Sequence, residues 1–489
     1  MSASEGSGTF SSRWGMLLVM LGMAVGTGNI WRFPRIAATN GGGTFLIPWA
    51  IFLLTWSVPL LLVEFAMGKA ARRGPIGAFA TLIGENWAWM GAWVVLCATF
   101  IMFYYSVVTG WTLRYLSAAV SGELPGAEPG ALWESYAGSG WAVLTMAISL
   151  GISIWVVARG VRGIEQASRV MMPILLILVV ILAIRAVTLP GAIRGLAFLF
   201  TPDVAGLGNS RVWLEALTQN AWDTGAGWGL ALTYAIYMRA REDTTVNAFV
   251  LGFGNNSVSL LAGIMVLCTV FSIRPDASAE IVGAGNTGLT FIWVPQLFAA
   301  MPAGRLFMAA FFLALFFAAM TSLISMVELA TRALVDKGVA RGRAITWVAV
   351  AGFVLGVPSA LSLSVFENQD NVWGVGLLLS GLFFGIAVLR YGVNDFRERF
   401  VNSAGSDVRI GRIWNVAIWV VTFEALILLV WWFSQTISEQ GWAASLDPFV
   451  PWSLGTVVLQ FAVVLALCIA FNRRLARLAE PVERIGGQP

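Results

Sequence analysis

Long runs of apolar residues, separated by short polar segments, recur from one end of the chain to the other. A run of about 18 residues or more is long enough to cross the hydrocarbon core of a bilayer as a helix. Because no water is available there to bind the backbone, only helices and closed barrels can span it, and runs without polar–apolar alternation favour helices. The pattern predicts an all-α integral membrane protein with about twelve transmembrane helices. The predicted spans are residues 14–37, 44–68, 88–120, 139–158, 165–187, 210–240, 245–272, 304–338, 343–361, 369–394, 411–435 and 451–475.

The first and sixth predicted spans are interrupted by glycine-rich sequences, at residues 24–28 and 223–227. Interruptions at corresponding places in two halves are typical of transporters built from inverted repeats, whose broken helices frame a binding site at the middle of the membrane. We therefore predict a five-plus-five inverted repeat with broken first and sixth helices. The predicted division is an N-terminal tail (1–13), a first repeat (14–187), a second repeat (188–394), two appended spans (395–475) and a C-terminal tail (476–489).

The segment 273–300 is apolar in its second half but is punctuated by glycine and proline. Irregular backbone at membrane depth is tolerated where it lines a cavity. We expect this segment to form a re-entrant cap over a cavity rather than a span.

Composition agrees with a membrane protein, since 58% of the residues are hydrophobic and 11% are charged, against about 25% charged in soluble domains. The net charge of +4 is spread over many short loops, so a nucleic-acid partner is not implied. Basic residues such as Lys69, Arg159 and Arg341 fall in loops on one side of the predicted spans. By the positive-inside rule both termini are expected in the cytoplasm, with the lipid bilayer of the plasma (inner) membrane as the surroundings. Nothing in the sequence indicates the oligomeric state.

Several kinds of chemistry have no support in the sequence. The chain contains no histidine, no Walker lysine motif, no HExxH and no GxSxG, so hydrolysis-driven transport, a histidine proton relay and a membrane enzyme are all unsupported. The cysteines Cys97, Cys268 and Cys468 lie inside apolar segments without CxxC spacing and are expected to be packing residues.

Three side chains with oxygen ligands lie in otherwise apolar spans. Asn29 follows the first break, Asp223 opens the second, and Asn255 lies in the seventh span. A carboxylate inside the membrane is costly unless it is paired or binds a cation, so Asp223 is a candidate functional residue. The glycines of the two breaks have the alternative role of allowing close helix packing. Thr321 and Ser322, deep in the eighth span, have the alternative of bonding to the preceding turn of their own helix.

Two further pairs stand out near the predicted site. Arg32 and Asp370 are isolated opposite charges near the outer ends of the first and tenth spans, where they form either a gate or a solvated rim pair. Trp222 and Trp228 flank the second break, where aromatic faces can contact an apolar side chain or an ammonium group.

Several motifs resemble those of one known family. They are Arg-Trp-Gly at 13–15, Gly-Met-Ala-Val-Gly-Thr-Gly-Asn-Ile-Trp-Arg-Phe-Pro at 22–34, Asn-Gly-Gly-Gly-Thr-Phe at 40–45 and Ala-Ala-Met-Thr-Ser at 318–322. With these the chain resembles the neurotransmitter:sodium symporter family, in particular its bacterial leucine-transporter-like members, over essentially its whole length. The resemblance implies the leucine-transporter fold, symport driven by Na+, and alternating access to a site at the middle of the membrane.

The resemblance also implies site residues. A first sodium site would use Ala24, Asn29, Asp223 and Asn255, and it departs from the family at Asp223, where serine or threonine is usual. A second would use Gly22, Val25, Ala318, Thr321 and Ser322, all matching the family. The substrate pocket would consist of Met23, Ala24, Thr27, Gly28, Ile101, Tyr105, Trp222, Asp223, Gly225, Trp228, Ser322 and Met326.

Gates and ion dependence follow from the same resemblance. Arg32 and Asp370 match the outer gate, and Tyr237 and Asp336 match inner-gate positions. The inner-gate arginine of the family falls at Ser7 here, so this gate must close differently, with Arg13 as one candidate. The positions that hold chloride in dependent relatives are Trp49, Gln219, Asp223 and Ser259, and a fixed carboxylate at Asp223 could replace the anion. Two other roles are open for Asp223. It binds the amine of the substrate, or it takes up a proton after sodium leaves and carries it back as the empty transporter returns, which would give proton antiport.

The sequence therefore predicts a sodium-coupled, chloride-independent symporter of an amino acid or similar small solute. Gly26 stands where monoamine carriers of the family have an aspartate, which leaves room for a substrate carboxylate at Tyr105. The alternatives are a symporter of a small amine or methylated ammonium solute, and a transporter-like receptor or uncoupled channel.

Overall fold

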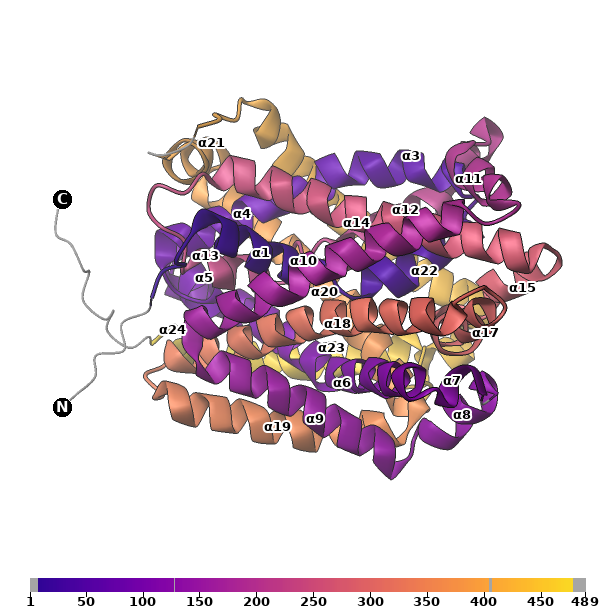
Figure 1. The fold of residues 1–489 in the computed structure, drawn as a ribbon. Helices are drawn as coiled ribbons and strands as arrows, with labels where there is room; N and C mark the ends of the chain where they lie inside the picture. Colours follow the sequence, from indigo (N-terminus) through magenta and orange to yellow (C-terminus); the bar gives the residue numbers. More distant parts are fainter. Residues whose placement is uncertain (1–7, 127, 404–406, 478–489) are drawn as a thin grey trace.

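Helices that run side by side between two ends of the molecule make up the fold (Figure 1). The computed structural model describes residues 8–126, 128–403 and 407–477. Within these residues, nine helices are long and apolar enough to cross a membrane, and the broken first span makes a tenth. The broken sixth span and a shorter apolar helix near the C-terminus bring the total to the expected twelve.

The first span is broken where the glycines predict it. Helix α1 (Arg13–Ala24) ends at Val25, whose backbone is extended with φ −72° and ψ 98°. The chain resumes as a π-helical turn, η1 (Gly28–Arg32), and as α2 (Phe33–Thr39). The two parts are bent by 52° relative to each other.

Spans two to five follow as predicted, with small changes of boundary. The second span is α3 (Gly43–Phe52), the π-helical η2 (Leu53–Ser57) and α4 (Val58–Ala71). The next three are α6 (Ala88–Ser121), α9 (Gly140–Ala158) and α10 (Gly160–Val187). Helix α10 begins five residues before the predicted 165.

The sixth span is broken between α12 (Ser210–Asp223) and α13 (Leu230–Ala235). Gly225, Gly227 and Gly229 have φ of 69°, 88° and 77°, which side chains other than glycine rarely adopt. The fully buried Glu64 of α4 accepts hydrogen bonds from the backbone N–H groups of Gly227 (2.6 Å) and Leu232 (3.1 Å). This carboxylate therefore satisfies donors that unwinding the helix leaves free.

The remaining spans differ from the predicted ends, most strongly at the start of α20 and the end of α22. They are α14 (Thr244–Ile273), α18 (Gly304–Val335), α19 (Arg341–Leu361), α20 (Leu363–Tyr391), α22 (Ile413–Leu446) and α23 (Leu454–Ala470). Helix α20 starts six residues earlier than predicted, and α22 continues past residue 435 to a non-helical Gly441 and beyond.

Short helices cover the two ends of the bundle. One end carries α5 (Pro75–Ile83), α13, α21 (Val393–Phe396) and α24 (Asn472–Ala476), and the opposite end carries α7 (Glu123–Gly126), α8 (Pro129–Tyr136), α11 (Ala192–Phe200), α15 (Ser278–Gly283) and α17 (Val294–Ala299) (Figure 1). The expected cap, 273–300, lies at this second end as short helices, and its Phe291 stacks on Trp133 with ring centroids 5.0 Å apart. Large apolar side chains such as Ile177, Val354 and Phe423 are exposed on the flanks of the bundle, as a bilayer requires.

Candidate functional site

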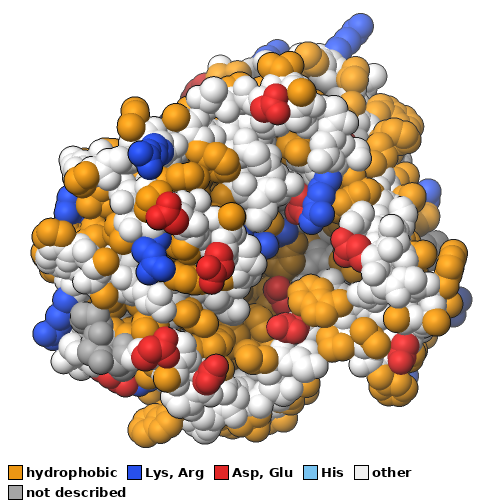
Figure 2. All heavy atoms as spheres, turned by 90° about the vertical axis from the view of Figure 1, so that its right-hand side faces the viewer, with side chains coloured by type: hydrophobic (Ala, Val, Ile, Leu, Met, Phe, Trp, Pro, Cys, Tyr) orange, Lys and Arg blue, Asp and Glu red, His pale blue; other side chains and the backbone are white. Residues whose placement is uncertain are grey.

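A cavity of about 710 Å³ lies between the two broken spans and opens toward the end that carries α7, α8 and α11. Figure 2 views this end and shows it hollowed, with acidic and apolar side chains around the opening. The cavity floor is formed by Met23, Ala24 and Ser322, and its outer part reaches Arg211 and Trp452. The site is therefore open at one end of the bundle and closed at the other.

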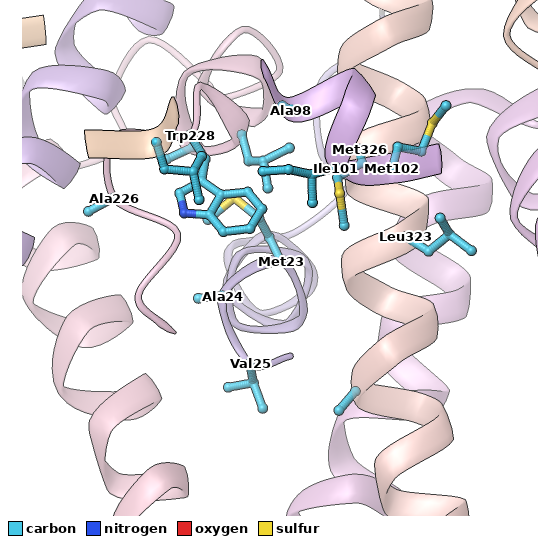
Figure 3. Close-up of a cluster of buried hydrophobic side chains, with 14 of the residues drawn as sticks. Met23, Ala24, Val25, Ala98, Ile101, Met102, Ala226, Trp228, Leu323 and Met326 are labelled. Atoms are coloured by element: carbon cyan, nitrogen blue, oxygen red, sulfur yellow. The ribbon is translucent and has the colours of Figure 1, made fainter. Parts of the chain in front are cut away.

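All the residues expected in the substrate pocket line this cavity except Ile101. Ile101 is fully buried one helical turn before Tyr105 on α6. It belongs to the buried apolar cluster that also contains Met23, Trp228 and Met326, and it supports the pocket wall from behind (Figure 3).

The Tyr105 hydroxyl is held beside the first break. It accepts hydrogen bonds of 3.1 Å from both the backbone N–H and the hydroxyl of Thr27. A Cβ atom on Gly26 would lie 2.9 Å from Ser322 Oγ and 3.1 Å from Tyr105 Oη. A larger side chain at Gly26 would therefore occupy the space in front of both hydroxyls.

The Asp223 carboxylate faces the opposite side of the break. Its Oδ2 accepts a hydrogen bond of 2.6 Å from Ser259, whereas its buried Oδ1 has no hydrogen-bond partner among the described residues. A Cβ atom on Gly28 would lie 3.1 Å from this Oδ1. An unpartnered carboxylate oxygen that lines a cavity can bind a cation or an ammonium group.

Hydrogen-bond directions at Asn29 determine which atoms face the expected first sodium site. Asn29 Oδ1 accepts from the Gly26 N–H at 2.8 Å, so its amide nitrogen faces Asn255 (2.9 Å) and Ser259 (2.8 Å). Asn255 must then direct its side-chain oxygen toward the Asn29 amide nitrogen, which donates to it. That oxygen lies 3.2 Å from the Ala24 carbonyl oxygen and 3.0 Å from the Asp223 carbonyl oxygen. Three oxygens this close repel one another unless a cation lies between them, so Ala24, Asp223 and Asn255 fit Na+, while Asn29 orients Asn255 through its amide nitrogen.

The residues of the expected second sodium site also come together. Val25 N–H donates to Leu21 O at 2.7 Å and the helix then ends, which leaves the carbonyl groups of its last turn free to bind an ion. A Cβ atom on Gly22 would lie 3.1 Å from Thr321 Cβ, so the eighth span packs directly on this turn. Ser322 donates to Met23 O at 3.4 Å. The Thr321 hydroxyl donates to Phe317 O and Ala318 O in the preceding turn of its own helix, which is the alternative role considered for it. The hydroxyl oxygen still has lone pairs that can accept a hydrogen bond or bind a cation.

The outer-gate residues line the cavity without closing it. Arg32 lies over the Trp222 ring, with its guanidinium carbon 5.3 Å from the ring centroid. Asp370 lines the same cavity, and the ion pairs present among the described residues do not include one between it and Arg32. If Arg32 and Asp370 form the expected outer gate, that gate is open in this arrangement.

The residues expected at the inner gate, by contrast, each take part in a group of ion pairs and hydrogen bonds. The Tyr237 hydroxyl donates to Glu328 at 2.6 Å, and Arg341 forms a salt bridge of 2.6 Å with the same carboxylate. Asp336 pairs with Arg332 at 2.8 Å and accepts from the Gly74 N–H at 2.6 Å. The sequence analysis did not single out Glu328 or Arg341 for this region, although an acid inside an apolar span, as Glu328 is in α18, is a usable signal.

The chain just before α1 is fastened to α10. Phe10 is buried, and its ring packs edge-on against Tyr234 and Tyr237. The backbone N–H and the hydroxyl of Ser11 donate to Glu165 at 2.8 and 2.7 Å. This fastening, which we call the N-terminal latch (Phe10–Ser12 with Glu165), was not expected from the sequence.

Two basic residues and one glycine complete the latch. Arg169 donates to Ser11 and Ser12 and forms a salt bridge of 2.7 Å with Glu165, and Arg239 donates to Ser11 O at 2.5 Å. A Cβ atom on Gly15 would lie 1.8 Å from Glu165 Oε1, so the glycine of the Arg-Trp-Gly motif makes room for the carboxylate. Arg13 is exposed, and Ser7 lies outside the described residues.

Comparisons with known proteins found similar sequences and a similar fold. The profile of the sodium:neurotransmitter symporter family matches residues 7–143 and 131–480. An uncharacterized sodium-dependent transporter of Methanocaldococcus jannaschii is 31% identical over 94% of this chain and 97% of its own. One of Bacillus subtilis is 34% identical over 77% of this chain and 82% of its own. Among solved structures, MhsT in complex with L-phenylalanine superposes with a TM-score of 0.78 at 30% identity, covering 87% of this chain and 99% of that one.

Proposed function

Because the chain belongs to the sodium:neurotransmitter symporter family, we propose that it uses the sodium gradient to import an amino acid with an apolar side chain. Membership makes it a multi-pass membrane transporter rather than an enzyme. The identity of the solute, the role of each site residue and the independence from chloride are the parts that we propose.

The observation that carries the proposal is the placement of Tyr105 and Asp223 on two sides of one short backbone break. The Tyr105 hydroxyl accepts from Thr27 and keeps its own proton to donate to a carboxylate beside Gly26. The unpartnered oxygen of Asp223 lies beside Gly28. Gly26 and Gly28 are two residues apart, which is at most about 7 Å of chain. A donor for a carboxylate and an acceptor for an ammonium group at this separation suit a free α-amino acid.

The rest of the pocket favours an apolar side chain. Met23, Met326 and the rings of Trp222 and Trp228 line it, and the two rings pack edge-to-face with centroids 6.0 Å apart. Such a surface binds an aliphatic or aromatic group by burial and dispersion. The relative MhsT was solved with L-phenylalanine, and this amino acid is therefore the first substrate to try.

Two sodium ions are proposed to bind beside the substrate. The oxygens around Asn255 suit the first ion, and the free carbonyls at the end of α1, together with Thr321 and Ser322, suit the second. Because both sites include the backbone of the first break, bound sodium holds α1 against α18 and α14. Sodium therefore favours the outward-open arrangement, which prepares the pocket for substrate.

Asp223 is also proposed to replace chloride as the negative charge near the first ion. It is buried and is linked through Ser259 to Asn29. Gln219, one turn earlier on α12, has a buried carboxamide with no partner among the described residues. A fixed carboxylate here balances the sodium charge without a dissociable anion.

One observation favours a second candidate. Two tryptophan rings and a carboxylate around one cavity can also bind a methylated ammonium solute by cation–π attraction. Such a solute would leave Tyr105 without a carboxylate unless the solute is itself a betaine.

The experiment is uptake into proteoliposomes with an inward sodium gradient. We expect labelled L-phenylalanine or another apolar amino acid to accumulate in sodium and not when potassium replaces it. Competition by choline or glycine betaine in place of amino acids would favour the second candidate. If no amino acid and no methylated amine accumulates in response to sodium, the proposed function is wrong, and binding without uptake would indicate a receptor.

A further inference from the structure

Helix α20 carries several glycines in its interior, where glycine lowers helix stability relative to alanine. Two of them make room for side chains of the surrounding scaffold. A Cβ atom on Gly376 would lie 2.9 Å from Cys97 Sγ, and one on Gly381 would lie 2.9 Å from Trp56 Cζ2. Cys97 and Trp56 are both buried. These two glycines are therefore explained by close packing between spans.

Gly374, on the same helix, makes room for a side chain of the cavity instead. A Cβ atom on Gly374 would lie 2.1 Å from Trp222 Cζ2 and 3.0 Å from Cε2 and Cη2 of the same ring. Both residues line the cavity. The edge of the Trp222 indole thus lies in the space that the missing Cβ leaves, and we call this space the Gly374 notch. Arg32 covers one face of the ring, with its guanidinium carbon 5.3 Å from the centroid.

Trp222 is the part of the cavity wall whose position depends on this notch. The other indole, Trp228, is anchored because its Nε1 donates to Ala221 O at 3.1 Å. Met23 and Met326 also line the cavity, and their flexible side chains adapt to a ligand. An indole is rigid and changes the wall only by turning as a whole. The place at which the Trp222 ring comes to rest therefore limits the room for a substrate side chain.

A methyl group in the notch would push the ring toward the cavity. Carbon atoms that are not bonded pack at about 3.5–4.0 Å, so the ring edge would have to move by about 1.5 Å from its present place. The backbone resists this movement, because the neighbouring Asp223 is held by its 2.6 Å bond from Ser259. Helix α20 closes the space behind the ring, and the free space lies in the cavity. The pocket would become shallower by about the length of one carbon–carbon bond.

We propose that Gly374 determines how large a substrate side chain the pocket accepts. Because the notch takes up the edge of the Trp222 indole, the cavity keeps the depth that an aromatic side chain needs. Gly374 acts through Trp222 and is therefore a positioning residue. The proposal rests on the proposed uptake of an apolar amino acid, and it adds the structural reason for the size of the side chain that is accepted.

The test measures how the purified full-length protein binds amino acids of increasing size. L-Alanine, L-leucine, L-phenylalanine and L-tryptophan are titrated at saturating sodium, and the apparent affinity is read from the rise of the melting temperature with ligand concentration. In Gly374→Ala we expect the affinity for the two aromatic amino acids to fall about tenfold or more relative to that for L-alanine, since one methylene in an apolar pocket changes recognition about 10–200-fold. The sodium concentration for half-maximal binding should stay nearly unchanged. Equal losses for all the amino acids, or an unchanged preference, would overturn the proposal.

Two further variants separate the notch from a general effect on the helix. Gly376→Ala adds a methyl group two residues further along α20, against Cys97 rather than Trp222, and it should keep the wild-type preference. Gly374→Ala with Trp222→Phe replaces the indole by a smaller ring, and it should recover the preference for L-phenylalanine. A shifted preference in Gly376→Ala, or no recovery in the double variant, would contradict the proposal.

Trp222→Phe alone tests the proposal even if Gly374→Ala does not fold. It removes the edge of the indole that lies in the notch, so the pocket gains depth. We expect the preference to move from L-phenylalanine toward the larger L-tryptophan, and an unchanged preference would overturn the proposal. The same titrations also test the proposed function. If the wild type binds none of these amino acids in sodium, the proposed function fails and this inference fails with it. If the wild type binds them and the variants leave the preference unchanged, only the inference is wrong.

Discussion

The Ser259 hydroxyl donates a hydrogen bond of 2.6 Å to Asp223 Oδ2, and this bond sets the direction of a chain of hydrogen bonds. Because its proton points to the carboxylate, Ser259 can only accept from Asn29, which donates at 2.8 Å. Asn29 in turn accepts from Gly26 and leaves Asn255 to present oxygen. An ionised Asp223 would thus orient, from the neighbouring helix, the oxygens of the proposed first sodium site.

Removal of the Asp223 charge should make transport depend on chloride. In Asp223→Ser a small cavity with neutral donors replaces the carboxylate, and the sodium charge is no longer balanced. We expect uptake by the wild type to be unchanged when gluconate replaces chloride, and uptake by the variant to need chloride. Strong chloride dependence of the wild type would rule out the role as an anion surrogate. Loss of all binding, unrestored by chloride, would favour the amine-binding role instead.

Loss of the hydroxyls at the second sodium site should weaken sodium binding more than substrate recognition. Thr321→Val and Ser322→Ala each remove one oxygen that faces the end of α1. We expect the sodium concentration for half-maximal uptake to rise on the order of tenfold, equivalent to about 1.4 kcal/mol. Ser257→Ala, an exposed hydroxyl on α14, is the matched control. An unchanged sodium dependence in the double variant would show that this site is not used.

A methyl group at Gly26 should interfere with the substrate carboxylate. The Cβ atom of Gly26→Ala would approach Ser322 and Tyr105 to 2.9 and 3.1 Å, so both hydroxyls must shift. We expect the apparent affinity for an amino acid to fall at least tenfold and that for an amine lacking a carboxylate to change little. Equal losses for both compounds would mean that the methyl group perturbs the break as a whole. The readout is competition binding in detergent at saturating sodium.

Neutralisation of the outer gate should separate binding from turnover. Arg32 and Asp370 line the open cavity without a salt bridge and would attract each other once the cavity narrows and loses water. In Arg32→Gln with Asp370→Asn we expect binding to persist, bound substrate to dissociate faster, and uptake to fall severalfold. Dissociation is measured after dilution of labelled substrate. An unaltered dissociation rate together with normal uptake would mean that the two charges form a solvated rim pair.

Weakening of the N-terminal latch should favour a state in which the bundle is open at the end that carries the latch, which is closed in this structure. In Glu165→Gln the bonds from Ser11 and Arg169 lose the negative charge that strengthens them, and bonds to charged groups are worth about 1.5–3 kcal/mol each. We expect poorer sodium binding, because the outward-open state is less populated, and faster labelling of a cysteine at Ser325. Arg162→Gln, one turn away, should change neither. Normal sodium affinity in Glu165→Gln would show that the latch does not hold the gate.

The fold was largely predictable, because apolar length and glycine breaks are local properties of the sequence. The first break and the twelve spans appear as expected. The start of α10 at Gly160 was missed because a polar sequence with two glycines and Arg162 precedes the apolar run. The π-helical turn η2 has no composition that distinguishes it from an α-helix.

The site was predictable where a residue acts through its own chemistry, and less so where it acts through a distant partner. Asn29, Asp223 and Asn255 converge as the resemblance implies. The contact of Ser11 with Glu165 joins residues 154 positions apart, and nothing in either segment indicates the other. The place of Ile101 behind the pocket depends on the rotation of α6 about its axis, which an apolar helix without a clear polar face does not specify.

The bend after Val25 makes α1 a lever. Its 12 residues span about 18 Å, so a rotation of about 10° at the bend moves the far end by about 3 Å. That displacement is enough to break every bond that Ser11 makes to Glu165, while the carbonyls nearest the pivot move by a fraction of it. A small movement at the expected ion sites would thus become a movement large enough to release the latch. The length of α1 therefore connects the expected ion sites beside the bend to the latch at the far end of the helix.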